Sequence, residues 1–266
     1  NNIPKLFVEP LATLIGIPLL THQLGYLNIL PLYITLLLAT PLLIWVGLRW
    51  PVLLLGASVA LWAMAGQFRL NLPNYPNAGG WFFNPLSWQI LFVTGLLCGM
   101  AMKQGKRFFP RTQLLFGLTL GWVLLVLLWI KLPLIGSAGM AGLSALSQAG
   151  LPFYLTWFDK TFVALPRLLH ALALFYVVAS IGSIRGFAQT AWAAPLRLLG
   201  RQGLPVFAFG TVLSMALQAI KVPLPQDVLI DTMLLGTGLA LQLGLAWALT
   251  RTAEMARAAS PQRNPA

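Results

Sequence analysis

Four polar residues between positions 159 and 170 carry side chains suited to acid–base or binding chemistry. Asp159 and Lys160 are adjacent in the sequence. Arg167 and His170 stand three residues apart, which places both on one face of a helix. The cluster can grip a hydroxylated or anionic substrate, and His170 and Asp159 are the candidates for proton transfer. A simpler interpretation stays open, in which Arg167 extends to water and Asp159 pairs with Lys160. In that case His170 makes one hydrogen bond to another helix.

A second pair of carboxylates occurs near the C-terminal end of the chain. Asp227 and Asp231 are four residues apart and share a helix face. Asp227 fits the first turn of a helix, where the dipole favours a negative charge. Asp231 lies one turn deeper and needs a partner, for which Arg167 and Lys221 are the candidates. We therefore include Asp231 among the predicted substrate-binding residues.

The stretch 84–89 combines amide and aromatic groups at the start of an apolar run. Asn84, Trp88 and Gln89 are predicted to bind substrate, because sugar C–H faces stack on rings while sugar hydroxyls need donors and acceptors. The alternative is a helix that begins at a proline within an interfacial belt of aromatic residues, which needs no ligand.

The segment 103–111 is strongly basic. Lys106, Arg107 and Arg111 are predicted to bind the phosphates of a donor such as an acyl-coenzyme A. Signals for membrane orientation and binding to anionic headgroups explain the same charges equally well. The sequence has no phosphate-cradling glycine loop, no zinc-type histidine spacing and no nucleophile elbow, so we predict no metal site and no bound cofactor.

The elements that must position these residues are membrane helices. Of the 266 residues, 58% are apolar and 8% are charged, and the mean hydropathy is +0.81. A soluble domain carries about 25% charged residues, so a soluble protein is excluded. We predict an all-α, polytopic integral membrane bundle. About seven spans are bounded by Pro, Gly and basic residues: 28–48, 51–67, 86–102, 113–131, 163–184, 204–220 and 228–250.

The net charge of +12 reflects how cations are distributed between the two sides of the membrane, and nucleic acid is not needed to explain it. On this map one side collects eleven cations, namely Arg49, Lys103, Lys106, Arg107, Arg111, Arg185, Arg197, Arg201, Arg251, Arg257 and Arg263. The other side collects six, namely Lys5, Arg69, Lys131, Lys160, Arg167 and Lys221. The larger set predicts the cytoplasmic side, with the C-terminus inside.

Three regions are expected along the chain. Residues 1–27 are interrupted by prolines and charges and predict an interfacial or re-entrant segment outside the membrane. Residues 28–250 predict a single transmembrane bundle, and residues 251–266 a disordered cytoplasmic tail. The connections 68–85 and 132–162 are too long for simple turns, and we expect them to be functional or disordered. The aromatic run after Pro152 argues against disorder in the second half of 132–162.

Several of these stretches resemble the membrane region of the OpgC family, in order and spacing, over residues 24–250. The matching segments are Asn28-Ile29-Leu30-Pro31-Leu32-Tyr33, Asn84-Pro85-Leu86-Ser87-Trp88-Gln89-Ile90-Leu91-Phe92, Asp159-Lys160-Thr161 followed by Arg167-Leu168-Leu169-His170, and Gly200-Arg201 leading to Leu204-Pro205-Val206-Phe207. One departure is Gln202-Gly203, where the family usually has His-Ser after Gly-Arg.

The resemblance implies an activity and a location. The family belongs with the acyltransferase-3 superfamily, whose members move acyl groups onto extracytoplasmic carbohydrates. OpgC proteins are associated with succinylation of osmoregulated periplasmic glucans, which implies succinyl-CoA or a similar acyl-CoA as co-substrate. It also implies a multi-pass protein of the bacterial inner membrane, with the lipid bilayer and the periplasmic glucan as its partners. Outer residues would orient the glucan, and the basic loop would hold the donor.

The resemblance also implies about ten helices in a complete protein. The catalytic His of the superfamily and its neighbouring Arg and Asp residues have no counterpart in this chain. Because the first residue is Asn1, we expect this chain to be the later part of a larger enzyme whose upstream helices supply the general base. Two other functions stay open: a transporter or flippase for a glycan or acyl donor, and a catalytically inert scaffold.

Overall fold

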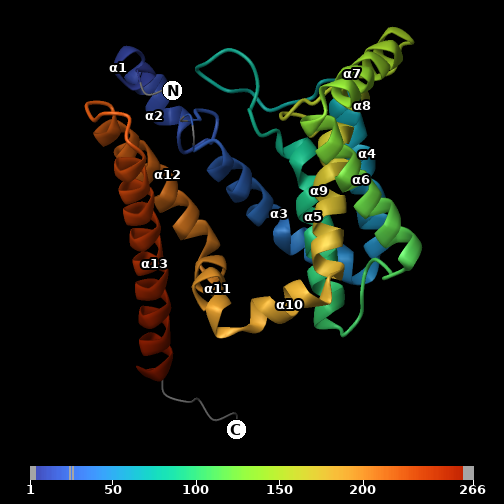
Figure 1. Ribbon diagram of the computed structural model, residues 1–266. Coiled ribbons are helices and arrows are strands. Elements are labelled where there is room, and N and C mark those ends of the chain that lie inside the picture. The colour runs from blue at the N-terminus through green and yellow to red at the C-terminus, as the bar shows by residue number, and fades with distance from the viewer. Residues whose placement is uncertain (1–3, 24, 26, 260–266) are drawn as a thin grey trace. The chain divides into compact units, whose positions relative to one another are not determined.

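The structure is a computed structural model and describes residues 4–23, 25 and 27–259. For residues 257–259 it describes the backbone without the side chains. Arg263 and the side chain of Arg257, both assigned to the larger set of cations, lie outside this part. The chain divides into two compact units at Ile181 and Gly182, and each unit is described by itself (Figure 1). The described residues form helices and connections, with one isolated β-bridge between Pro73 and Gly80.

The first unit holds a group of long helices and several short ones. Its helices are α1 (Lys5–Val8), α2 (Pro10–Gly16), α3 (Ile29–Arg49), α4 (Pro51–Gln67), α5 (Pro85–Lys103), α6 (Gln113–Lys131), α7 (Pro133–Gln148), α8 (Phe153–Thr156) and α9 (Leu165–Ser180). Proline at the first helical position begins several of them, since it lacks the N–H that a helix start leaves unbonded. Asn84 and Thr112 cap α5 and α6, accepting from Leu86 N and Leu115 N.

The second unit contains two long helices preceded by a short bent segment. Its elements are α10 (Gly182–Gln189), the 3-10 turn η1 (Ala191–Ala193), α11 (Ala194–Arg201), α12 (Gly203–Lys221) and α13 (Val228–Ala259). Lys221 and Asp231 form an ion pair where α12 ends and α13 begins. Gln202 Nε2 donates to Thr250 Oγ1 at 3.3 Å at the other end of α12. The two long helices are therefore antiparallel neighbours.

The predicted fold class is confirmed, and the predicted number of spans is approximate. In the described part, α3, α5, α6, α12 and α13 are long and apolar enough to cross a membrane. The broken pair α9 and α10 adds a sixth span if it counts as one. The remaining predicted span, α4, has 17 residues, or about 25 Å of helix against a hydrocarbon core of about 30 Å.

Three segments differ from the sequence-based expectation. The span expected over 163–184 ends at Ser180, and a separate helix begins at Gly182. The Gly/Ser/Ala-rich half of 132–162 is helix α7 instead of a loop, and α8 follows it. The segment expected to be a tail is helical up to Ala259, because α13 continues past Arg251.

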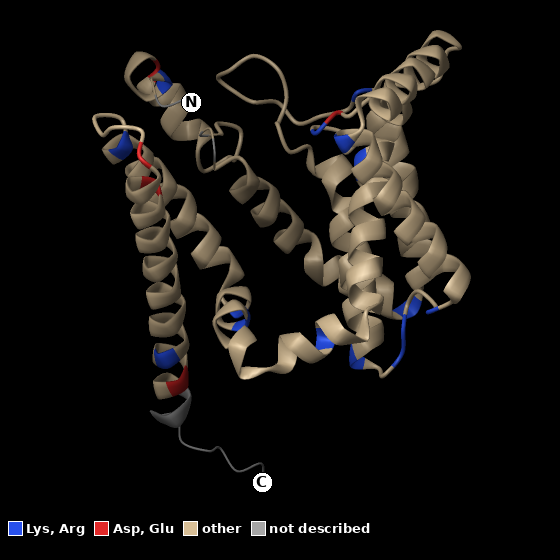
Figure 2. Cartoon of the chain, in the orientation of Figure 1, with Lys and Arg blue, Asp and Glu red and all other residues tan. Residues whose placement is uncertain are grey.

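In the first unit, charged residues lie at helix ends and in connections, while the middles of the long helices are free of them (Figure 2). In the first unit, Gly47 near the end of α3 lies against Leu97 and Met100 near the end of α5. Arg111, just before α6, donates to the carbonyl of Ser180 at the end of α9. We call this the basic end: the ends of α3, α5 and α9, with residues 103–111. Successive long helices of the first unit thus run in opposite directions, as the predicted division of cations between the two sides of the membrane requires.

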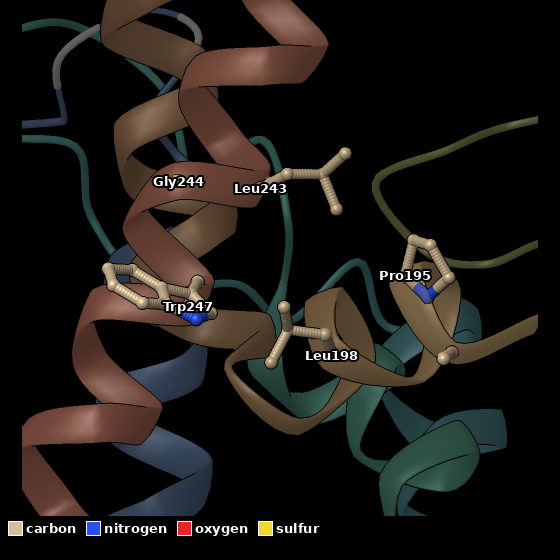
Figure 3. A pocket seen from close by; sticks show the side chains of 6 residues that line it. Pro195, Leu198, Leu243, Gly244 and Trp247 are labelled. Atoms are coloured by element: carbon tan, nitrogen blue, oxygen red, sulfur yellow. The ribbon is translucent and has the colours of Figure 1, made fainter.

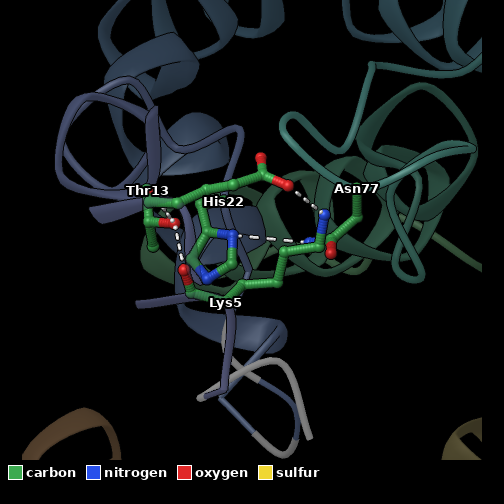
Figure 4. Close-up of polar contacts among 5 residues, drawn as sticks. Lys5, Thr13, His22 and Asn77 are labelled. Carbon is green, nitrogen blue, oxygen red and sulfur yellow. Dashed lines mark hydrogen bonds and ion pairs between the residues drawn. The ribbon is translucent and has the colours of Figure 1, made fainter. Parts of the chain in front are cut away.

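The N-terminal segment packs on the long connection between α4 and α5. Lys5 and Glu9 form an ion pair at 2.9 Å, and Thr13 Oγ1 donates to the carbonyl of Glu9 at 2.8 Å. His22 is 3% exposed, and its Nδ1 lies 3.4 Å from Asn77 Nδ2 (Figure 4). Because an amide nitrogen only donates, His22 Nδ1 can accept this hydrogen bond only while it carries no proton.

This contact should weaken in acid. Burial, and then the charge of Lys5, lower the pKa of His22 from its usual 6.5. When the N-terminal segment is detached, His22 takes up a proton at a higher pH than when the segment is packed. The contact is therefore at full strength above about pH 6.5 and weakens as the pH falls toward the lowered pKa. Hydrogen-exchange protection of the His22 amide, which donates to Gly16 O, should fall over that range. His22→Gln should show no such pH dependence, and unchanged protection in the unsubstituted protein would contradict the prediction.

Candidate functional site

Two tryptophans hold the connection between α8 and α9. Trp62 Nε1 on α4 donates to the carbonyls of Phe162 and Val163, both at 3.1 Å. Trp88 Nε1 on α5 donates to the carbonyl of Lys160 at 2.9 Å. The connection 157–164 is thereby tied to both neighbouring helices. We call this region the aromatic end: the end of α4, the start of α5, and residues 153–170.

Asp159 shapes this connection from within. Its Oδ1 accepts from Phe162 N at 2.8 Å, and its carbonyl accepts from Ala164 N at 3.1 Å. The turn also holds Val163 in the left-handed region, at φ 48°. Among the described ion pairs none joins Asp159 to Lys160, so the pairing offered by the simpler interpretation is not present. One carboxylate oxygen of Asp159 stays available for other contacts.

Three cations surround the aromatic end. Lys160 and Arg167 are exposed, and Arg167 Nε donates to the carbonyl of Phe158 at 2.6 Å, which leaves its terminal nitrogens for other contacts. Arg69, in the connection after α4, places its guanidinium carbon 4.2 Å from the ring centroid of Phe153. None of the three takes part in an ion pair within the described residues. The aromatic end is therefore a positively charged surface with rings beside its charges.

His170 lies one helical turn beyond Arg167 on α9. Its Nδ1 is buried and has no hydrogen-bond partner in the described part of the chain. No hydrogen bond connects His170 to Asp159 among those described, so the two candidates for proton transfer do not form a linked pair. His170 Nδ1 is therefore a buried nitrogen whose hydrogen-bonding capacity is unused among the described residues.

Asn84 and Gln89 have internal partners instead of facing a ligand. Asn84 is fully buried, its Nδ2 donates to Leu70 O at 2.7 Å, and its Oδ1 caps α5. Gln89 Oε1 accepts from Ser58 Oγ at 2.5 Å, and its Nε2 donates to Ser58 O at 2.9 Å. Their role is therefore to fix α4, α5 and the loop between them. Trp88, which is half-buried, keeps part of its ring for other contacts.

Two contributors to the site were missed by the sequence analysis. Arg69 was counted only as a charge in a long connection, and nothing local signals that it stacks on Phe153, 84 positions away. Ser58 looked like an ordinary small residue of an apolar helix. Its pairing with Gln89 joins positions 31 residues apart. Both relationships depend on which helices become neighbours.

Asp231 belongs to the second unit and has a partner there. Of the two candidates named for it, Lys221 forms the ion pair. Asp227 Oδ1 accepts from Leu229 N at 2.7 Å at the start of α13, in line with a helix-start role.

The three basic candidates are all exposed, and Arg111 is hydrogen-bonded to a neighbouring helix. Arg111 donates to the carbonyl of Ser180, and Tyr176 Oη donates to Pro110 O at 2.8 Å, so the segment before α6 is fixed to α9. Lys106 and Arg107 are exposed. Across the described residues, no three His, Cys, Asp or Glu side chains gather as metal ligands.

Comparison with known proteins gives one result. Residues 1–254 match the model of a protein family described as OpgC protein. No curated protein and no solved structure matches the chain. Since the match extends over nearly all of its residues, the chain belongs to the OpgC family.

Proposed function

We propose that this chain is part of a membrane acyltransferase that adds an acyl group, succinyl by preference, to hydroxyls of osmoregulated periplasmic glucan. Membership of the OpgC family supports a role in glucan modification. The observation that carries the finer proposal is the charged and aromatic surface formed by Arg69, Lys160 and Arg167 beside Phe153 and Trp88. Glucan and a dicarboxylic acyl group both match it chemically.

The chemistry of this surface fits the two reactants. Sugar C–H faces stack on aromatic rings, and sugar hydroxyls bond to charged donors. The free carboxylate of a succinyl group pairs with a guanidinium or an ammonium group. In the transfer, the glucan hydroxyl oxygen attacks the thioester carbonyl, the C–O bond forms, the C–S bond breaks, and the hydroxyl proton passes to the thiolate. Lys160 and Arg167 bind and orient the reactants for that step.

The two ends of the first unit would face different compartments. The larger set of cations supports placing the basic end and the C-terminus in the cytoplasm, and the aromatic end in the periplasm, of the bacterial inner membrane. Lys106 and Arg107 then meet the phosphates of an acyl-CoA donor, while Arg111 mainly holds α6 to α9. Among the described residues, His170 Nδ1 is the candidate for the general base.

The test replaces the binding cations in the full-length protein. With Lys160→Gln and Arg167→Gln combined, acyl groups per glucan, measured by mass spectrometry of glucan from cells, should fall at least tenfold, since each charged hydrogen bond contributes about 1.5 kcal/mol or more. Arg185→Gln, which removes an exposed cation of the second unit, is the matched control. Wild-type acylation by the double variant, at equal protein level, would refute the proposal.

His170 is tested separately. His170→Ala should reduce acyl content if the imidazole exchanges a proton with the substrate, and wild-type acylation would remove it from the reaction. Asp159→Asn keeps an oxygen for Phe162 N, so any loss of acylation with this variant reports on the carboxylate charge.

A further inference from the structure

A groove lined by apolar residues runs between α11 and α13 in the second unit. Its volume is about 530 Å³. The groove is open along one side and is lined by Ala194, Pro195, Leu198, Leu243, Gly244 and Trp247 (Figure 3). None of these residues carries a charge, so the surface suits a hydrocarbon chain.

The length of α13 gives the depth of this groove in a membrane. Asp231 and Arg251 are 20 positions apart on α13, which corresponds to about 30 Å of helix, the thickness of a bilayer hydrocarbon core. Trp247 lies one turn before Arg251, whose guanidinium carbon is 5.7 Å from its ring centroid. The Trp247 end of the groove therefore lies at the boundary between acyl chains and headgroups, where tryptophan concentrates.

Arg251 lies beside that end, and Arg201 follows Leu198 of the lining by three residues on α11. Gln202 Nε2 donates to Thr250 Oγ1 at 3.3 Å. Arg201 directly precedes Gln202 in the sequence, and Arg251 directly follows Thr250. Arg197 has another task, since its Nη1 donates to the carbonyls of Ala188 and Thr190 at 2.6 and 2.7 Å and fixes the turn between α10 and α11. Glu254 is the one acid in the sequence from 232 onward, so positive charge dominates this end of the unit.

We propose that the groove binds one acyl chain of an anionic phospholipid, whose phosphate lies between Arg201 and Arg251. Apolar lining, interfacial depth and paired cations are the three features that such a lipid needs. Each arginine near a membrane surface favours an anionic headgroup about fivefold, so two give a preference of about 25-fold over a zwitterionic lipid. This inference does not depend on the acyltransferase proposal.

The structure offers a substitution with a matched control. A Cβ added at Gly244 would meet no heavy atom within 4 Å, and the same is true at Gly236 on the same helix. Gly244→Leu therefore adds a branched side chain to the groove lining at a position where its Cβ has open space. Gly236→Leu makes the same chemical change away from the groove lining. Comparing the two variants separates filling of the groove from general effects on α13.

The experiment measures lipid retained by the purified full-length protein in native mass spectrometry. Its probes are phosphatidylglycerol and phosphatidylcholine with identical acyl chains. The protein should retain phosphatidylglycerol about 25-fold better, Gly244→Leu should lower that retention at least tenfold, and Gly236→Leu should leave it unchanged. The pair Arg201→Gln and Arg251→Gln should remove the headgroup preference while lipid still binds.

Three results would overturn the proposal. Wild-type retention by Gly244→Leu would show that the lipid does not occupy the groove. Equal retention of the two lipids by the unsubstituted protein would show that the arginines do not recognise a phosphate charge. Displacement of phosphatidylglycerol by soluble glycerol phosphate would show that the acyl chain contributes nothing. None of these results bears on glucan acylation, which is measured in cells on different residues.

Discussion

Trp62→Ala should lower the free energy of unfolding by about 3 kcal/mol, the usual cost of truncating a buried aromatic side chain. Trp62 is 6% exposed and packs with Ile90, Val163 and Leu168 in a buried cluster. Its ring also meets that of Tyr154 edge to face, with centroids 5.3 Å apart. The measurement is equilibrium unfolding of the purified protein in detergent.

The same variant should loosen the connection that carries Asp159 and Lys160. Without the indole donor, the carbonyls of Phe162 and Val163 lose their bonds to α4. Hydrogen exchange at the Phe162 amide should therefore quicken. Trp62→Phe keeps a ring but no donor, and should cost only about 1 kcal/mol while still quickening that exchange.

A matched tryptophan gives the control for this prediction. Trp192 is 88% exposed, so Trp192→Ala should change the free energy of unfolding by less than about 0.5 kcal/mol. Equal stability losses for Trp62→Ala and Trp192→Ala would show that the cluster around Trp62 does not hold the first unit together.

The long helices were predictable because local sequence defines them. Apolar runs bounded by proline, glycine and basic residues give α3, α5, α6 and α12 close to their observed limits, and they give the start of α13. Helix α7 was expected to be a loop, because its Gly and Ser content lowers its hydropathy. The small residues serve packing instead: Gly139 lies directly against the ring of Trp129 on α6. Composition alone does not separate a loop from a helix of small residues.

Short amphipathic elements were missed for a different reason. Helices α10 and α11 have eight residues each, too few to be recognised by a search for spans of about 20 apolar residues. In these two helices arginines alternate with apolar residues. The sequence analysis used these arginines, namely Arg185, Arg197 and Arg201, only to predict the orientation of the chain in the membrane. The groove against α13 follows from how α11 folds back, which is a tertiary relationship.

The candidate site was predictable where its residues are close in sequence. Asp159, Lys160, Arg167 and His170 lie within one connection and one helix, so local spacing brings them together. Asn84 and Gln89 were predicted to bind substrate, and the structure gives them Leu70 and Ser58 as hydrogen-bond partners. Whether a buried amide faces a ligand or another helix depends on helix pairing, which local spacing does not give.

Gly66→Ala should destabilise the protein by about 2 kcal/mol, because it adds volume where two elements touch. A Cβ at Gly66 would lie 2.6 Å from Tyr154 Cγ and 2.9 Å from Tyr154 Cδ1. Tyr154 cannot easily move, since its ring packs against Trp62. The expected result is displacement of α8 and of the connection that follows it, so the proposed glucan acylation should fall together with stability.

The same helix provides the control, and Tyr154 provides the rescue. A Cβ at Gly56 on α4 would meet no heavy atom within 4 Å, so Gly56→Ala should leave both stability and acylation intact. Tyr154→Ala removes the two ring carbons that clash and keeps only the Cβ, 3.0 Å away, so adding Gly66→Ala to it should cost much less than it does in the unsubstituted protein. An additive loss in the double variant would mean that Gly66 is needed for some reason other than contact with the Tyr154 ring. Because the contact ties the end of α4 to α8, a non-additive result would show that this glycine sets the position of the aromatic end.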